Sequence, residues 1–305
     1  MLDAKPGFYH ICYIMKPLLF FVALLPIIFT LFCSQEKFNT VNRMHVYSIQ
    51  PHNDSLYFST SDSGIFRFSS DNPTSITPVA RSGNLPIRSI VFSKEGTCLA
   101  GSYYSGVQYL SKDTLLPLVH FPWRSWSIKF DPTGNLWLAG LYGIFRQQSD
   151  SLVLFNHKQE AHDIAFYNNE VAVANRNGIF IFNRESGALL REFCKGVNCW
   201  TVMQYDSLFI GGGLNVCVII NKDRCSTITF GPKGNMVWST IKDSTGALYL
   251  ATQNGLYRAE AGSLRARCVG FKGICIKSLA FDNKGKLWVG RFSKKQKKPF
   301  LGIRW

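Results

Sequence analysis

The sequence predicts an all-β fold, a single seven-bladed β-propeller of four-stranded antiparallel blades. Short apolar or alternating runs separated by glycine-containing turns follow one another after residue 44, and no helical periodicity interrupts them. The same unit returns roughly every 35 to 42 residues, about seven times in all. Four strands in about 40 residues are the size of one blade, and blades that cannot bury both faces alone stack into a ring.

Residues 126–146 show the unit most clearly. Residues 127–130 alternate between polar and apolar, residues 131–134 (Asp-Pro-Thr-Gly) form a turn, and residues 136–139 are a short apolar run. A second turn follows before another strand begins at Ile144. Three further copies, aligned on the turn glycine, cover residues 87–96, 237–252 and 276–290, and less regular copies start at residues 46, 163 and 201.

These repeats resemble the two-component regulator propeller repeat, whose pattern is approximately I-x-x-I-x-x-D-x-x-G-x-L-W-[IVL]-G-[ST]-x-x-G-[IL]. Residues 126–145 and 276–290 match it well, and residues 87–107 and 237–257 match it fairly well. The resemblance covers most of the chain after residue 44. It implies a propeller of the kind that senses ligands outside the membrane, often followed by further blades, a membrane span and a histidine kinase. No kinase-like segment or DNA-binding helix pair follows in this sequence.

The last repeat stops after its third strand. Residues 302–305 correspond to residues 143–146 of the clearest copy, and no fourth strand follows. Two interpretations remain open. Residues 38–43 supply the outer strand of the last blade and so join the termini, or the chain is a fragment of a longer protein.

The N-terminal segment predicts export. Met15-Lys16 precedes an apolar run over residues 17–32, which is typical of a secretory signal or anchor, and Met15 is the expected true start. Cys33 resembles a lipoprotein acylation site, although Phe32 stands where that site needs a small residue. Lipoprotein, uncleaved anchor and simple secretion all place the propeller in the periplasm or cell envelope. The predicted organisation is residues 1–33 as signal or anchor, 34–43 as tether or closing strand, and 44–305 as propeller.

The formal net charge of +15 could suggest a nucleic-acid partner, but an exported protein rarely meets one. Anionic glycans or an anionic membrane surface are the expected acidic partners. The sequence has no C-x-x-C motif and no histidine cluster, so no metal or cofactor is expected. It also lacks a Gly-x-Ser-x-Gly elbow, and we expect no enzyme activity. Three cysteine pairs are spaced to form disulfides or to be small buried residues, namely Cys194/Cys199, Cys217/Cys225 and Cys268/Cys275.

Alignment of the repeats reveals one column of aromatic and cationic side chains at the start of each first strand. Because the first strand of a blade lines the central channel, this column predicts a ring around the axis. The predicted ring consists of Tyr47, Arg88, Trp126, His162, Trp200, Trp238 and Lys277. The next column is polar and consists of Ser48, Ser89, Ser127, Asp163, Thr201, Ser239 and Ser278.

The ring suits an extended polar ligand, because aromatic faces stack on sugar rings and cations donate to hydroxyls or carboxylates. We therefore predict a non-catalytic, sensor-like propeller that binds glycans or their fragments. Two alternatives remain open. The ring is mere packing in a protein-interaction scaffold, or the chain is a propeller lyase or hydrolase, for which only the pair His162 and Asp163 gives a hint.

Overall fold

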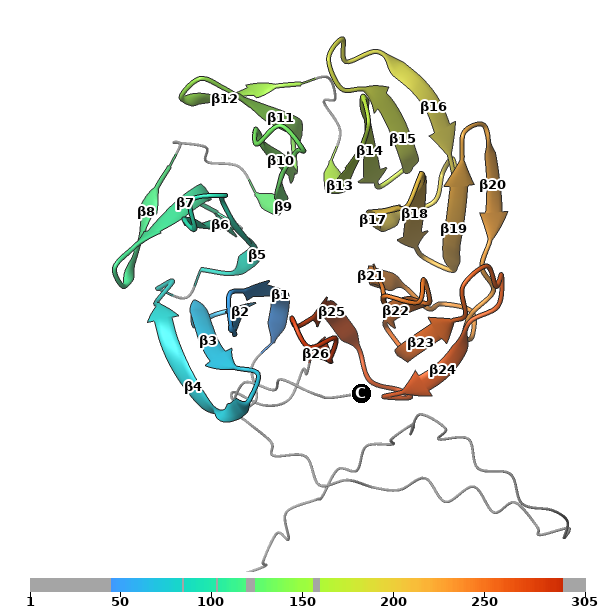
Figure 1. Ribbon diagram of the computed structural model, residues 1–305. Helices are drawn as coiled ribbons and strands as arrows, with labels where there is room; N and C mark the ends of the chain where they lie inside the picture. The colour runs from blue at the N-terminus through green and yellow to red at the C-terminus, as the bar shows by residue number, and fades with distance from the viewer. Residues whose placement is uncertain (1–44, 84, 103, 119–123, 156–159, 293–305) are drawn as a thin grey trace, which may run out of the picture.

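The computed structural model describes residues 45–83, 85–102, 104–118, 124–155 and 160–292. Its strands form antiparallel sheets arranged radially around one axis, as Figure 1 shows. In each complete blade the first strand lies innermost and the fourth outermost. None of the described segments forms a helix of the length and apolar character needed to cross a bilayer.

The described residues form six sheets of four strands each. The first three blades consist of β1 (Val46–His52), β2 (Ser55–Thr60), β3 (Ile65–Ser69) and β4 (Asn72–Ala80); β5 (Ile87–Phe92), β6 (Cys98–Ser102), β7 (Gly106–Ser111) and β8 (Thr114–Pro117); and β9 (Ser125–Phe130), β10 (Leu136–Gly140), β11 (Gly143–Gln148) and β12 (Ser151–Leu154).

The next three blades consist of β13 (Ala161–Tyr167), β14 (Glu170–Asn175), β15 (Gly178–Asn183) and β16 (Leu189–Phe193); β17 (Cys199–Tyr205), β18 (Leu208–Gly213), β19 (Val216–Asn221) and β20 (Arg224–Thr227); and β21 (Val237–Lys242), β22 (Leu248–Thr252), β23 (Gly255–Ala259) and β24 (Arg267–Gly270).

The prediction of seven four-stranded blades is wrong, because the described residues form six. The last described sheet has two strands, β25 (Ile276–Phe281) and β26 (Leu287–Arg291), and β25 packs beside β21 and β1. The sequence after β26 also differs from that of the other blades. In five complete blades a glycine with positive φ stands at or just before the start of the third strand, whereas Phe-Ser-Lys-Lys-Gln-Lys-Lys-Pro follows Arg291 and the next glycine is Gly302. The expected third strand at residues 302–305 and the candidate closing strand at residues 38–43 lie outside the described residues, as does the whole segment 1–33 with Cys33.

The core lies between the blades. Trp137 of β10 is fully buried against Ile164 and Phe166 of the following blade. Trp288 of β26 packs with Phe68 of the first blade, with 4.8 Å between ring centroids. The two-stranded sheet therefore bridges the sixth blade and the first.

The repeat turns are fastened by one recurring hydrogen bond. Trp137 Nε1 donates to Asp131 Oδ2 at 2.9 Å, and Trp288 Nε1 donates to Asp282 Oδ2 at the same distance. Burial acts to raise the pKa of Asp131, but hydrogen bonds from Thr133 and Trp137 outweigh it and hold that pKa below its ordinary value. The aspartate and the aromatic residue of the repeat pattern are thus partners in one contact.

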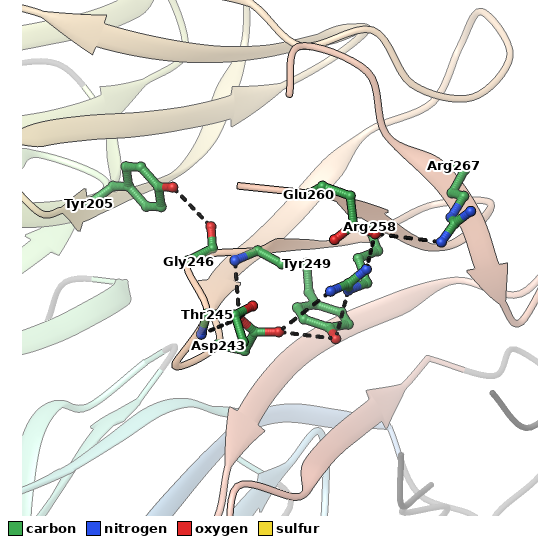
Figure 2. Close-up of polar contacts among 9 residues, drawn as sticks. Tyr205, Asp243, Thr245, Gly246, Tyr249, Arg258, Glu260 and Arg267 are labelled. Carbon is green, nitrogen blue, oxygen red and sulfur yellow. Dashed lines mark hydrogen bonds and ion pairs between the residues drawn. The ribbon is translucent and has the colours of Figure 1, made fainter. Parts of the chain in front are cut away.

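The sixth blade has a variant of this turn, shown in Figure 2. Tyr249 takes the place of the tryptophan, and its hydroxyl lies 3.5 Å from Asp243 Oδ2. Arg258 Nε donates to the same hydroxyl at 3.0 Å, and the guanidinium also pairs with Glu260. A phenol reaches the aspartate less closely than an indole does, and the arginine completes its hydrogen bonding.

The seven cysteines after Cys33 form no disulfide bond with one another in the described part of the chain. Cys98, Cys199 and Cys217 are buried, as expected for small apolar residues in strands, whereas Cys225 and Cys268 are exposed.

Candidate functional site: the ring in the central channel

The seven predicted ring residues all line one cavity at the propeller axis. The inner strands β1, β5, β9, β13, β17, β21 and β25 surround this axis in Figure 1. The cavity has a volume of about 520 Å³, and its wall contains the whole ring together with the polar column that follows it. The fold therefore brings the seven aligned side chains together, and their role in ligand binding stays a prediction.

A β-bulge holds each ring residue in place. In the first blade Val46 lies opposite Thr60 and Ser48 lies opposite Ser59, so that Tyr47 is the extra residue between two paired ones. The same register shift occurs at the ring position of the other six inner strands. A bulge leaves its extra residue out of the ladder and re-aims the side chain. Seven bulges at one level thus direct seven side chains toward the axis.

Four ring residues form a continuous aromatic arc. Trp200 meets Trp126 edge to face, with 5.5 Å between ring centroids, and meets Trp238 in the same way at 5.1 Å. His162 lies flat on Trp200, with 3.8 Å between centroids. Such contacts stabilise aromatic pairs beyond the apolar area that they bury. Part of the ring is therefore packed against itself.

His162 belongs to the wall of the channel. It is 4% exposed, and its Nδ1 donates to the carbonyl of Cys199 at 2.6 Å, which leaves Nε2 facing Glu160 at 3.4 Å. Burial lowers the pKa of His162 despite the opposing effects of these two partners. The imidazole is therefore neutral at pH 7 and supports Trp200.

The other three ring residues form a second arc, which consists of Tyr47 and the two cations Arg88 and Lys277. The guanidinium carbon of Arg88 lies 4.1 Å from the ring centroid of Tyr47 and 4.9 Å from that of Trp126. The ammonium of Lys277 lies over the face of Trp238. Burial lowers the pKa of Lys277 to about 7, Cys275 acts to raise it, and the charge of Arg88 adds to the lowering.

The polar column ties neighbouring blades together. Ser89 Oγ accepts a hydrogen bond from the amide of Ile128 at 3.1 Å. Asp163 accepts from the hydroxyl of Ser127 at 2.8 Å and from the amide of Val202 at 3.1 Å. These contacts join consecutive inner strands, so much of the column serves the ring closure of the fold.

Two residues that the sequence reasoning missed also belong to this region. Lys129 lines the cavity, and its ammonium lies 2.7 Å from Asp163 Oδ1. Phe292 contacts Lys277, Tyr47 and His45, and its ring centroid lies 4.2 Å from that of His45. Lys129 stands in the alternating run after Trp126 and could have been found there, whereas Phe292 follows β26 without any repeat signal.

Some residues that line the cavity have buried polar atoms without a partner. Trp200 Nε1, Thr240 Oγ1 and Ser278 Oγ are buried and have no hydrogen-bond partner among the described residues. A buried donor without a partner is costly, so such atoms indicate places for a bound polar group or water. Within the described ranges, no three His, Cys, Asp or Glu side chains are grouped so that they could hold a metal ion.

No protein-family model matches the sequence, and no curated protein matches it either. Solved structures do. The extracellular domain of the putative one component system BT4673 from B. thetaiotaomicron is 19% identical with a TM-score of 0.68, over 81% of this chain and 39% of that one. The extracellular domain of the putative hybrid two component system BT3049 from the same organism is 13% identical with a TM-score of 0.68, over 85% of this chain and 38% of that one.

Virginiamycin B lyase from Staphylococcus aureus is also similar, 13% identical with a TM-score of 0.67 over 85% of this chain and 95% of that one. The chain thus spans well under half of the two extracellular domains and nearly the whole length of the lyase. At these identities the likeness concerns the fold. The resemblance inferred from the repeats is confirmed at that level, since the similar structures include extracellular domains of a hybrid two-component and a one-component system with this propeller. Extracellular domains of one-component and two-component systems and a lyase share the fold, which by itself therefore does not decide between such functions.

Proposed function

We propose that this chain is a non-catalytic, extracytoplasmic propeller of the sensor type, which binds a small extended polar ligand in its channel ring. One observation carries the proposal: seven bulged residues of the predicted ring line a single cavity of about 520 Å³. That volume lies within the range of small-molecule sites, about 300 to 1,000 Å³. The apolar run over residues 17–32 and the extracellular domains with the same fold support the location.

The ligand class that we propose is a glycan or a fragment of one. Three half-buried indoles, Trp126, Trp200 and Trp238, surround the cavity, and indole faces stack on the apolar faces of sugars. Trp200 Nε1 lacks a hydrogen-bond partner among the described residues and can donate to a sugar hydroxyl. The aromatic arc is also packed against itself, so binding and packing have to be separated by experiment.

A lyase or hydrolase is less well supported. The pair that hinted at chemistry, His162 and Asp163, is engaged elsewhere. His162 donates to Cys199 and lies under Trp200, while Asp163 holds Ser127 and the strand at Val202. A general base needs access to its substrate proton, which a side chain buried like His162 lacks.

The test is a thermal-shift titration of the full-length chain with neutral and acidic oligosaccharides. A ligand that binds only the native state raises the melting temperature in a saturable way. Trp200→Phe keeps an aromatic ring against His162 but removes the N–H donor, and it should weaken the shift. Trp137→Phe is the matched control, because this tryptophan lies between blades, outside the cavity.

With the control variant we expect a lower starting temperature and an undiminished shift. If a cooperatively melting protein shows no shift with any saccharide, the proposal is wrong and a protein-interaction scaffold becomes the better interpretation. An equal loss of the shift in both variants would also contradict it, because the effect would then follow stability rather than contact.

A further inference from the structure

Ring closure brings two cations of the channel into one arc. Lys277 stands on β25 and Arg88 on β5, far apart in the sequence. β25 packs beside β1, which in turn packs beside β5, so the two cations flank Tyr47. The aromatic arc occupies the opposite part of the ring. The channel is therefore polarised across its width, aromatic on one side and cationic on the other.

The charges of the cavity wall do not cancel. Among the described residues that line it, the basic ones are Arg88, Lys129 and Lys277, and the one acidic residue is Asp163. Lys129 and Asp163 form an ion pair at 2.7 Å. The ammonium of Lys277 contacts aromatic rings and has neither a hydrogen-bond acceptor nor a carboxylate among the described residues. A partly buried ammonium in this setting is a strong attractor for an anion.

Neighbouring groups make the charge of Lys277 sensitive to such an anion. The titratable or charged groups around it are Tyr47 from β1, Arg88 from β5 and Cys275 just before β25, while β26 contributes Arg291 beside the start of β25. The facing residue of β21, Trp238, does not titrate. Burial and then the charge of Arg88 favour the neutral amine, with a pKa of about 7. A negative charge placed between the two cations would favour the ammonium instead.

We infer that the ligand of this channel carries a negatively charged group and that this group binds between Arg88 and Lys277. The inference rests on the proposed function and adds the charge of the ligand to it. Carboxylate, as in a uronic acid, and sulfate ester, as in a sulfated sugar, share the required chemistry. The uncharged part of the ligand then extends toward Trp200 and Trp238.

The test is calorimetric titration of the full-length chain with three probes: oligogalacturonate, its fully methyl-esterified form and a sulfated disaccharide. An acidic probe should bind about tenfold more tightly than the ester. The binding of that probe should weaken as the pH rises from about 6 to about 8, because Lys277 loses its proton over that range. Titrations in buffers of different ionisation enthalpy should show proton uptake on binding. The two acidic probes distinguish carboxylate from sulfate as the source of the charge.

Three variants test whether the preference for the acidic probe and its pH dependence come from Lys277. Lys277→Met removes the charge and keeps most of the stem, so the preference for the acidic probe and the pH dependence should both disappear. Lys277→Arg keeps the charge without the titration, and it should retain the preference and lose the pH dependence. Lys242→Met is the control, since this lysine of β21 pairs with Asp206 outside the cavity. It should leave both effects unchanged.

The negative results distinguish a failure of the anion inference from a failure of the proposed function. Equal binding of oligogalacturonate, ester and sulfated sugar would overturn the anion inference and leave the proposed function standing. Preference for an acidic probe that survives in Lys277→Met would also overturn it, because the anion would then bind elsewhere. If no saccharide binds at all, the proposed function itself fails.

Discussion

The imidazole of His162 lies flat on the indole of Trp200, with 1° between the two ring planes. The two residues occupy the same position in consecutive repeats, and the main-chain carbonyl that fixes the imidazole belongs to Cys199, the residue before Trp200. One blade thus supplies a ring and the next supplies both its stacking partner and its hydrogen-bond acceptor. This contact sets the orientation of the aromatic arc, and it should be measurable in stability.

We expect His162→Ala to lower the free energy of unfolding by about 2 to 3 kcal/mol, because it removes the stacking contact and leaves the buried carbonyl of Cys199 without its donor. His162→Phe should cost less, since it keeps a ring against Trp200. Urea unfolding followed by fluorescence measures both. Equal losses in the two variants would show that stacking contributes nothing.

The same histidine predicts a dependence of stability on pH. Its folded-state pKa lies below the ordinary value of 6.5, so the unfolded chain binds a proton that the folded chain does not as the pH falls through that value. The free energy of unfolding should therefore decrease on acidification below about pH 6.5. In His162→Phe this component should be absent. A pH profile that the substitution leaves unchanged would assign the effect to other groups.

Lys277 predicts a dependence of stability on pH in a higher pH range. Its folded-state pKa of about 7 lies below the ordinary 10.5, so the unfolded chain binds the extra proton between these values and stability should rise with pH across them. Without ligand, Lys277→Met should be more stable than the unchanged protein near pH 6, and the difference should shrink toward pH 10. Chemical unfolding at several pH values measures this. A constant difference would place the ammonium in a well-solvated site.

Asp131 is expected to contribute strongly to the stability of the third blade. Asp131→Ala removes the acceptor of Trp137 Nε1 and of the amide and hydroxyl of Thr133, and should cost about 2 to 4 kcal/mol. Asp113→Ala is the control, because its side chain bonds only the exposed hydroxyl of the next residue among the described contacts, and it should change stability by less than about 0.5 kcal/mol. Thermal unfolding compares them.

Trp126→Ala and Trp200→Ala should not act independently. The two indoles touch, so the double variant should lose less than the sum of the single losses in free energy of unfolding, with a coupling of about 1 kcal/mol. Ligand binding should fall in each single variant. Strict additivity would mean that the two rings do not contact in solution.

Much of this site could be predicted because equivalent positions of aligned repeats occupy equivalent places in the fold. Aligning the turn glycines was enough to place seven side chains in one ring, although they are spread from Tyr47 to Lys277. The bulge at each of these positions has no signature in the sequence, since the residues there are as different as Tyr, Arg and His. The burial of His162 depends on a carbonyl of the next blade, which no pattern within one repeat encodes.

The number of four-stranded blades was predicted less well than the ring. Residues 276–290 match the repeat pattern well, and their two strands form as expected. The outer strands expected for this repeat fall at residues that the structure does not describe. The repeat pattern was therefore reliable for the inner strands that carry the ring.

The seven bulges also separate recognition from folding. A residue that takes no part in the hydrogen-bond ladder can change its chemistry while the ladder on either side keeps its register. Tyr47, Arg88 and Trp238 are three unrelated side chains held by the same backbone device. A change of specificity therefore needs substitutions only at bulged positions of the channel, provided that the stacked pair His162 and Trp200 is kept.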